Sequence, residues 1–163
     1  STGEEPYSIA MALTEVLGDK ADFQILATDI DTEALERAQR GIYAMEQVAK
    51  LEERRRKRFF QKGSAARAGF ARIRPDLAER VRFKTLNLVA PKWPVEERFD
   101  AIFCRNVMIY FDKTTQAKIL DRFAPLMKPD GLLFAGHSES FSYISDRFRL
   151  RGQTVYTLTL ATP

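Results

Sequence analysis

Residues 99–111, F-D-A-I-F-C-R-N-V-M-I-Y-F, constrain the fold more than any other part of the sequence. The mostly apolar stretch 99–104 is typical of a strand that is buried on both faces, as in a parallel sheet. It ends abruptly at Arg105 and Asn106, and ligands of open α/β sheets bind beyond the carboxyl ends of the strands. We therefore predict that Arg105 and Asn106 belong to a functional site. The alternative is that they only cap the helical turn that follows.

The rest of the chain alternates between predicted strands and helices. The pattern predicts strands at 23–28, 81–86, 99–104 and 132–135, and helices at 7–17, 32–40 and 114–127. Thr32 is expected to cap its helix and Gly41 to end it, and a turn at 128–131 follows the last helix. Strands 147–151 and 154–160 are predicted to form a hairpin through Gly152. The alternation indicates an α/β fold, with a mostly parallel, doubly wound sheet and an antiparallel C-terminal edge strand.

Residues 42–80, approximately, interrupt this alternation and are predicted to be an insertion. A charged helical stretch at 45–58 precedes two short strands, 59–62 and 70–74. The segment 50–84 contains thirteen Lys or Arg and four Asp or Glu, a net charge of +9 in a chain whose total is +4. This asymmetry predicts an acidic partner, although a solvated helix face is the common alternative. A nucleic-acid partner is disfavoured because Phe59, Phe60 and Phe70 follow strand periodicity.

Composition excludes several classes of protein. The 163 residues are enough for one domain with a buried core, and no apolar run approaches the roughly 20 residues of a membrane span. Cys104 is the only cysteine and His137 the only histidine, which excludes an internal disulfide and a zinc site built from cysteine and histidine. A single cysteine in a predicted core strand fits a reduced, cytoplasmic protein.

Polar residues near the predicted strand ends indicate a nucleoside-bearing ligand. Gly3 lies in a loop that opens the first helix, where glycine allows the backbone to approach a ligand closely. Asp29 follows about 25 residues later, near the spacing at which an acidic residue binds a ribose diol in nucleotide-binding units. Asn87 and Asn106 follow two further strands. Each residue alone is equally explained as a turn residue, but together, without a G-x-G-x-x-G, they favour a cofactor other than NAD.

The first residues predict that the chain is a fragment. It begins at Ser1 with a glycine-bearing loop that opens a helix, and such a loop normally follows a strand. We therefore expect the natural protein to continue upstream, the first strand of the sheet to be missing, and the chain to be poorly stable by itself.

Five segments together resemble the CheR-type chemoreceptor glutamate methyltransferases. They are S-T-G-E-E-P-Y-S, A-T-D-I-D-T, L-N-L at 86–88, the run 99–111, and G-L-L-F-A-G-H-S-E-S. The resemblance extends from residue 1 to about residue 160. It implies a Rossmann-like class I methyltransferase fold with a small inserted β-subdomain, lacking the family's N-terminal helical domain. It also implies transfer of a methyl group from S-adenosylmethionine to receptor glutamates, with S-adenosylhomocysteine as the product.

The resemblance implies a role for each site residue. Gly3 and Glu4 would contact the methionine part of the cofactor, and Asp29 its ribose hydroxyls. Asn87 and Leu88 would flank the adenine, and Cys104 would border the cofactor. Arg105 and Asn106 would face the site of methyl transfer, with Tyr110 close to the sulfonium or the incoming carboxylate. No metal is expected, and His137 is predicted to be structural because a glutamate carboxylate needs no general base.

The implied partner is the cytoplasmic domain of a methyl-accepting chemoreceptor. In the family the β-subdomain binds a peptide at a receptor's C-terminus by strand addition, which would make Phe59, Phe70 and Arg72 partner-binding residues here. The alternative is a non-catalytic module of the same fold that docks receptors or signalling partners. A nucleic-acid methyltransferase is disfavoured because no N-P-P-Y-like motif follows Cys104.

Overall fold

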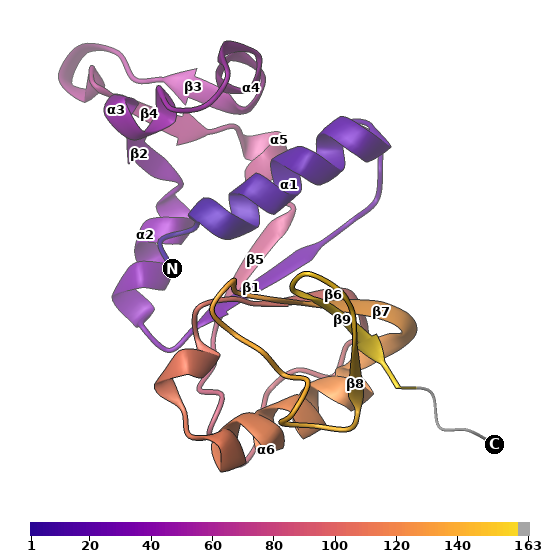
Figure 1. Ribbon diagram of the computed structural model, residues 1–163. Coiled ribbons are helices and arrows are strands. Elements are labelled where there is room, and N and C mark those ends of the chain that lie inside the picture. Colours follow the sequence, from indigo (N-terminus) through magenta and orange to yellow (C-terminus); the bar gives the residue numbers. More distant parts are fainter. Residues whose placement is uncertain (160–163) are drawn as a thin grey trace. The chain divides into compact units, whose positions relative to one another are not determined.

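Strands and helices alternate along the chain in the computed structural model, which describes residues 1–159 (Figure 1). The chain divides into two compact units, unit 1 (Ser1–Asn87) and unit 2, which begins at Leu88. The predicted α/β class, the parallel strand pairs and the antiparallel C-terminal edge are confirmed. The parallel strands lie in two sheets rather than in one continuous sheet, because the described pairings join β1 only to β5 and β6 only to β7 within the parallel set.

Unit 1 consists of a parallel strand pair, a small antiparallel sheet and several helices. In chain order its elements are α1 (Glu4–Leu17), β1 (Ile25–Asp29), α2 (Thr32–Arg40), β2 (Ile42–Ala44), α3 (Met45–Val48), α4 (Glu53–Phe59), β3 (Phe60–Lys62), η1 (Ala65–Arg67), β4 (Phe70–Ile73), α5 (Pro75–Ala78) and β5 (Val81–Thr85). β1 pairs in parallel with β5, so that Asp29 lies opposite Thr85. The antiparallel sheet has the order β2-β4-β3.

Helix α1 forms one side of the core of unit 1 and contacts β1, β5 and α5 (Figure 1). Its buried residues recur at helical spacing, at Tyr7, Ala10, Met11 and Thr14. The first three pack with Phe59 and other buried residues of unit 1. The Tyr7 hydroxyl donates a hydrogen bond to the Ala38 carbonyl oxygen at 2.8 Å, which ties α1 to the end of α2.

Helix α2 has the predicted bounds but a different cap. The Asp31 carboxylate accepts hydrogen bonds from the N–H groups of Glu33 and Ala34, at 2.9 and 3.1 Å, so Asp31 is the N-cap and the prediction of Thr32 is wrong. Gly41 ends the helix as predicted, with a left-handed φ of 59°.

The segment 42–80 contains one strand, β2, two short helices, η1 and α5, and one helix boundary that the sequence pattern did not predict. β2 is only three residues long and is defined by its pairing with β4, a contact between residues far apart in sequence. The predicted helix 45–58 is two helices, α3 and α4, because the chain turns after Val48, which is buried. The two short strands are confirmed as β3 and β4.

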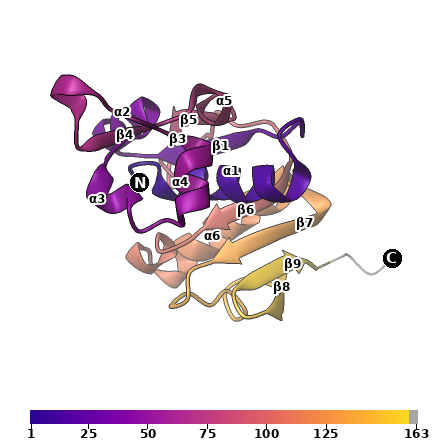
Figure 2. The same cartoon turned by 90° about the horizontal axis from the view of Figure 1, so that it is seen from above.

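Unit 2 is a mixed sheet packed against one long helix. Its elements are β6 (Phe99–Cys104), η2 (Met108–Tyr110), α6 (Lys113–Phe123), η3 (Ala124–Leu126), β7 (Met127–Ala135), β8 (Phe148–Gly152) and β9 (Val155–Leu158). The strand order is β6-β7-β9-β8, with β7 between β6 and β9 (Figure 2). Ile119, Leu120 and Phe123 of α6 share one core with residues of the sheet.

Two details of unit 2 differ from the predictions, and a third is not tested. The residues 128–131 form no separate turn but lie within β7, at an irregularity between the pairs Phe99–Met127 and Ala101–Leu132. The turn between β8 and β9 is made by Gln153, with a φ of 50°, and Thr154, while Gly152 is still part of β8. The predicted end of the last strand, Leu160, lies outside the described residues.

The burial of β6 also differs from the prediction. Phe103 is 40% exposed, although its ring stacks on Phe134 with the centroids 4.3 Å apart. β6 is at the edge of its described sheet, so its side chains are less covered than those of a central strand.

Trp93 is packed at the start of unit 2. Its ring lies 5.5 Å from the Phe123 ring, and the Arg122 guanidinium lies 3.9 Å from its centroid. The indole N–H donates to the Leu88 carbonyl oxygen at 3.2 Å.

Among the helices within residues 1–159, none combines the length and the apolar character that crossing a membrane requires.

Candidate functional site

The end of β1 presents a carboxylate that acts only as an acceptor. Asp29 Oδ1 accepts a hydrogen bond from the Asp31 N–H at 3.0 Å, and Oδ2 accepts one from the backbone nitrogen of Ser1. Burial raises the pKa of the Asp29 carboxyl, and the backbone hydrogen bond from Asp31 lowers it. The side chain is 24% exposed. An ionised, accessible carboxylate that already receives two donors fits the hydroxyl pair of a ribose.

The loop before α1 lies beside Asp29 through Ser1. The Gly3 N–H donates to the Ser1 hydroxyl oxygen at 3.3 Å, and the Thr2 hydroxyl lies 2.7 Å from both carboxylate oxygens of Glu4. Unit 1 therefore brings Gly3, Glu4 and Asp29 into one local network.

Gly3 is required by the packing of the protein itself. Its φ is 100°, and a Cβ at this position would lie 2.6 Å from the Tyr43 hydroxyl oxygen. That hydroxyl donates a hydrogen bond to the Thr2 carbonyl oxygen at 2.9 Å. Burial, and to a smaller extent the negative charge of Glu4, raises the pKa of the Tyr43 hydroxyl, which therefore stays protonated. Tyr43 was not predicted to belong to the site, since β2 itself was not predicted.

Asn87 lies at the same end of the parallel pair as Asp29. The Leu86 N–H donates to the Asp29 carbonyl oxygen at 2.9 Å, and the exposed Asn87 follows directly. Leu88, the first residue of unit 2, is half-buried and accepts the hydrogen bond from Trp93.

The end of β6 is a sharply turned loop. Cys104 is buried at 5% exposure, and Asn106 has a left-handed φ of 58°. Met108 is 1% exposed and fixes the start of η2, whereas Tyr110 at the end of η2 is 80% exposed. Asn106 is exposed and Arg105 half-buried. The predicted residues Cys104, Arg105, Asn106 and Tyr110 thus lie on one short loop of unit 2.

Glu139 is the residue of this loop region that the sequence reasoning missed. Its side chain is buried, at 8% exposure, and its carboxylate accepts hydrogen bonds from the backbone N–H groups of Asn106, Val107, Met108 and Gly136, at 2.7 to 3.1 Å. The only sequence signal was its place in G-H-S-E, two residues after His137. His137, predicted to be structural, is exposed rather than packed in the core.

The three predicted partner-binding residues differ in exposure. Phe59 is 3% exposed and belongs to the core of unit 1, so its side chain offers no surface to a partner. Phe70 is 49% exposed, and Arg72 is also exposed. Both lie on β4, the central strand of its sheet, so the strands with an unpaired edge among the described pairings are β2 and β3.

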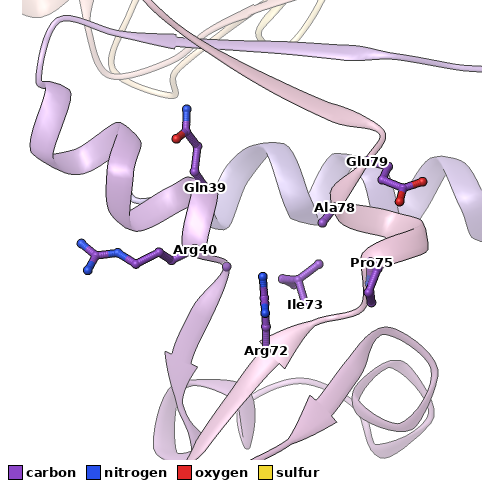
Figure 3. Close-up of a pocket in the computed structure, with 8 residues that line it drawn as sticks. Gln39, Arg40, Arg72, Ile73, Pro75, Ala78 and Glu79 are labelled. Carbon is purple, nitrogen blue, oxygen red and sulfur yellow. The ribbon is translucent and has the colours of Figure 1, made fainter.

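Arg72 also lines a pocket of about 220 Å³. Figure 3 shows Gln39 and Arg40 of α2 on one side of it and Glu79, next to α5, on the other, with Arg72 and Ile73 between them. The lining therefore combines two guanidinium groups with one carboxylate.

Part of the basic segment is paired with acidic residues of unit 1. The Arg55 guanidinium binds both carboxylate oxygens of Glu15, with the shortest N–O distance at 2.6 Å, and Arg58 binds Asp19 at 2.7 Å. The hydrogen bond from Arg55 holds the pKa of Glu15 below its usual range. The positive charge of this segment is therefore smaller toward solvent than the sequence count indicates.

Comparison with known proteins gives the same family over almost the whole described chain. Residues 1–157 match the family described as CheR methyltransferase, SAM binding domain. The chain is 56% identical over 160 residues to the "Chemotaxis protein methyltransferase" of Escherichia coli, covering 98% of this chain and 56% of that protein. It is 58% identical over 160 residues to the protein of the same name from Klebsiella aerogenes, covering 98% of this chain and 55% of that protein.

A more distant relative carries a similar name. The "Chemotaxis protein methyltransferase 2" of Pseudomonas aeruginosa is 48% identical over 158 residues, covering 96% of this chain and 56% of that protein. The chain thus spans a little over half the length of each of these three relatives.

Proposed function

The chain belongs to the CheR family of methyltransferases, as its S-adenosylmethionine-binding domain with a Rossmann-like class I fold, and on that premise we propose that it methylates glutamate side chains of chemoreceptors. The cofactor of this domain is S-adenosylmethionine. The proposed product on the receptor is a glutamyl methyl ester, which adjusts signalling in chemotaxis. Substrate and cofactor would meet in the cytoplasm, where a receptor exposes its signalling domain.

The loop beyond β6 is the observation that carries this proposal. It presents Arg105 and the exposed Tyr110, and the buried Glu139 carboxylate holds the backbone between them by hydrogen bonds. S-adenosylmethionine supplies an electrophilic methyl group on its sulfonium. A glutamate side chain is ionised at neutral pH and needs no general base, so the protein has only to orient it and exclude water. Arg105 would orient the carboxylate, and the Tyr110 hydroxyl would fix one of the two reactants.

The cofactor-binding roles rest on the two strand ends. In unit 1, Asp29 would accept hydrogen bonds from the ribose hydroxyls, and Gly3 and Glu4 would contact the methionine part. Asn87 and Leu88 would flank the adenine, and Cys104, Arg105 and Asn106 would border the cofactor from unit 2. The partial exposure of Asp29 and its link to the Gly3 loop support these assignments.

The partner proposal is that a receptor's C-terminal peptide adds a strand to the sheet β2-β4-β3. Such addition uses backbone hydrogen bonds for affinity and side-chain pockets for selectivity. The unpaired edges of β2 and β3 would accept the peptide backbone, with Phe70 and Arg72 beside it. Phe59 supports this sheet from the core and is no longer part of the proposed contact. Basic residues such as the exposed Arg54 would speed encounter with acidic receptor surfaces.

Calorimetry with S-adenosylhomocysteine, together with transfer of a labelled methyl group to a receptor cytoplasmic fragment, tests the function. We expect both binding and a base-labile methyl ester on glutamate. Binding without transfer would favour a non-catalytic receptor-docking module instead. Transfer to nucleic acid rather than to the receptor would reject the proposed substrate class.

Surface binding of a receptor tail peptide at two salt concentrations tests the docking proposal. Phe70→Ala and Arg72→Ala should raise the dissociation rate, while Arg54→Glu should slow association at low salt only. Arg149→Glu, an exposed arginine of unit 2, is the matched control. Unchanged binding after deletion of residues 60–73, or equal affinity for RNA, would contradict the docking role.

A further inference from the structure

Building on the methyl-transfer function proposed above, we propose that Glu139 is a positioning residue for that reaction. Its carboxylate fixes the backbone between Arg105 and Tyr110 and so determines where these two side chains lie. The proposal uses contacts within unit 2 alone.

Each oxygen of the Glu139 carboxylate accepts two backbone hydrogen bonds. Oε2 accepts from the Gly136 N–H at 2.7 Å and from the Asn106 N–H at 2.9 Å. Oε1 accepts from the N–H groups of Met108 and Val107, at 2.8 and 3.1 Å. Three consecutive residues of the loop are thereby bound to a side chain more than 30 residues later in the sequence.

A carboxylate is the side chain that this loop requires. The left-handed Asn106 turns the chain two residues after β6 ends, and the N–H groups at the start of η2 precede the first turn and find no partner within it. Buried N–H groups that lack an acceptor cost free energy comparable to a lost hydrogen bond. A glutamine at position 139 would keep the shape but replace one acceptor oxygen with an NH₂ donor, leaving two N–H groups opposed by a donor.

Gly136 completes the arrangement because it leaves room for the carboxylate. A Cβ at position 136 would lie 2.6 Å from Asn106 Oδ1 and 2.7 Å from Glu139 Oε2. The φ of Gly136 lies outside the left-handed range, so alanine there meets no backbone strain and acts only by displacing these atoms. Gly136 and Glu139 thus act as one unit, and a change at either should disturb the same loop.

The position of Tyr110 depends on this backbone. Its ring is 80% exposed, so packing of the ring does little to fix it. Its N–H donates to the Val107 carbonyl oxygen at 3.2 Å, and Val107 is itself bound to Glu139. Loss of the carboxylate would therefore release Tyr110 on one side and Arg105, the neighbour of Asn106, on the other.

Single-turnover methyl transfer to a receptor fragment tests the positioning role, using Glu139→Gln, Gly136→Ala, the double variant and the control Glu96→Gln. Glu96 is an exposed glutamate of unit 2, so its change removes the same charge from the surface. We expect each single variant to lower the transfer rate about 10- to 100-fold, with the affinity for S-adenosylhomocysteine changed less than about threefold. The transfer rate of the double variant should lie within about twofold of the rate of the slower single variant, because both changes disturb the same loop.

Three results of the transfer assay would overturn the proposal. One is a wild-type transfer rate in folded Glu139→Gln or Gly136→Ala. Another is a decrease in the transfer rate that is fully explained by a smaller folded fraction, as measured by thermal melting. The third is additive losses in the double variant. If Glu139→Gln fails to fold, the same criteria apply to Gly136→Ala, which retains the carboxylate.

Amide hydrogen exchange separates this proposal from the proposed function. In Glu139→Gln the amides of Asn106, Val107 and Met108 should exchange faster than in wild type, while the amide of Leu133 in the core does not change. A wild-type protein that transfers no methyl group to receptors would reject the proposed function, and with it the role in transfer. Unchanged exchange at the three amides would reject the anchoring itself, whatever the activity.

Discussion

The strand ends of unit 1 and unit 2 both carry polar residues, but they divide structural and functional tasks differently. At the end of β1, the Asp29 side chain itself accepts hydrogen bonds from Ser1 and Asp31, so the residue proposed to bind ribose also holds its surroundings. At the end of β6, Glu139 holds the backbone, and the side chains proposed for transfer, Arg105 and Tyr110, lie on either side of the held residues. Mutation of the proposed site residues in unit 2 should therefore lower activity without changing stability, whereas mutation of Asp29 in unit 1 should lower both cofactor binding and stability.

The largest effect is expected from Arg105→Ala and Tyr110→Phe, which test the separation in unit 2. Each should lower single-turnover methyl transfer roughly 100-fold, the scale on which misplaced reactants lose rate, with a much smaller change in cofactor affinity. The melting temperature should stay close to that of wild type.

Arg149→Ala and Tyr143→Phe are the matched controls, since Arg149 is exposed and Tyr143 is 96% exposed in the same unit. Wild-type transfer rates in Arg105→Ala and Tyr110→Phe would remove both residues from the site. A large loss of stability would instead mean that the loop does not separate the two tasks.

Asp29→Ala tests the combination of tasks in unit 1. It should weaken S-adenosylhomocysteine binding by about 1–3 kcal/mol, the cost of losing hydrogen bonds to a charged acceptor. Calorimetry measures this loss, and thermal melting should show a simultaneous decrease in stability because the Ser1 and Asp31 contacts are also lost. Asp22 is an exposed aspartate of unit 1, and the control Asp22→Ala should change neither the affinity for S-adenosylhomocysteine nor the stability. Weaker binding with unchanged stability would show that Asp29 has no structural task.

Gly3→Ala tests whether packing alone maintains the loop beside Asp29. The added Cβ meets the Tyr43 hydroxyl, and alanine must adopt the left-handed φ of this position. The protein should therefore lose about 1–2 kcal/mol of unfolding free energy, measured with urea. Gly69→Ala is the control for the left-handed φ, since its φ is 96° and no atom lies within 4 Å of its Cβ position. Tyr43→Phe in the Gly3→Ala background should restore part of the loss. Equal losses at positions 3 and 69 would exclude crowding as the cause.

The Glu15–Arg55 pair should show the smallest effect, because it is distant from both strand ends in sequence and lies at the surface. Glu15→Gln should cost below about 1 kcal/mol of unfolding free energy at pH 7 and leave cofactor affinity unchanged. Since the pKa of Glu15 is lowered from 4.5, the wild-type stabilisation is complete above that value and disappears as the pH falls through the lowered pKa. Urea unfolding of both proteins should therefore converge in acid. A difference that persists in acid would assign the effect to packing rather than to the ion pair.

Local sequence signals predicted the elements whose ends are set by neighbouring residues. β6 has the predicted bounds because an apolar run is followed directly by Arg105, and α2 ends at Gly41 because a left-handed residue is needed there. β2 was missed because three residues become a strand only by pairing with β4. The irregularity in β7 likewise depends on its pairing with β6.

The same distinction applies to the candidate site. Asp29 and Asn106 were found because they lie at or just beyond the ends of strands, and the grouping of Cys104 to Tyr110 on one loop follows from their sequence order. Glu139 could not be found in this way, since its importance lies in hydrogen bonds to residues more than 30 positions earlier. Phe59 was assigned to a partner contact because it was predicted to begin a strand, whereas it is the last residue of α4 and packs in the core of unit 1.

Trp93 provides an optical probe for one unit alone. It is the only tryptophan in the sequence, and it lies in unit 2 against Phe123 and Arg122. Excitation at the red edge of indole absorption therefore follows unit 2 without a signal from the tyrosines of unit 1. Because its N–H also binds the Leu88 carbonyl oxygen, its emission should respond when the backbone at the beginning of that unit moves.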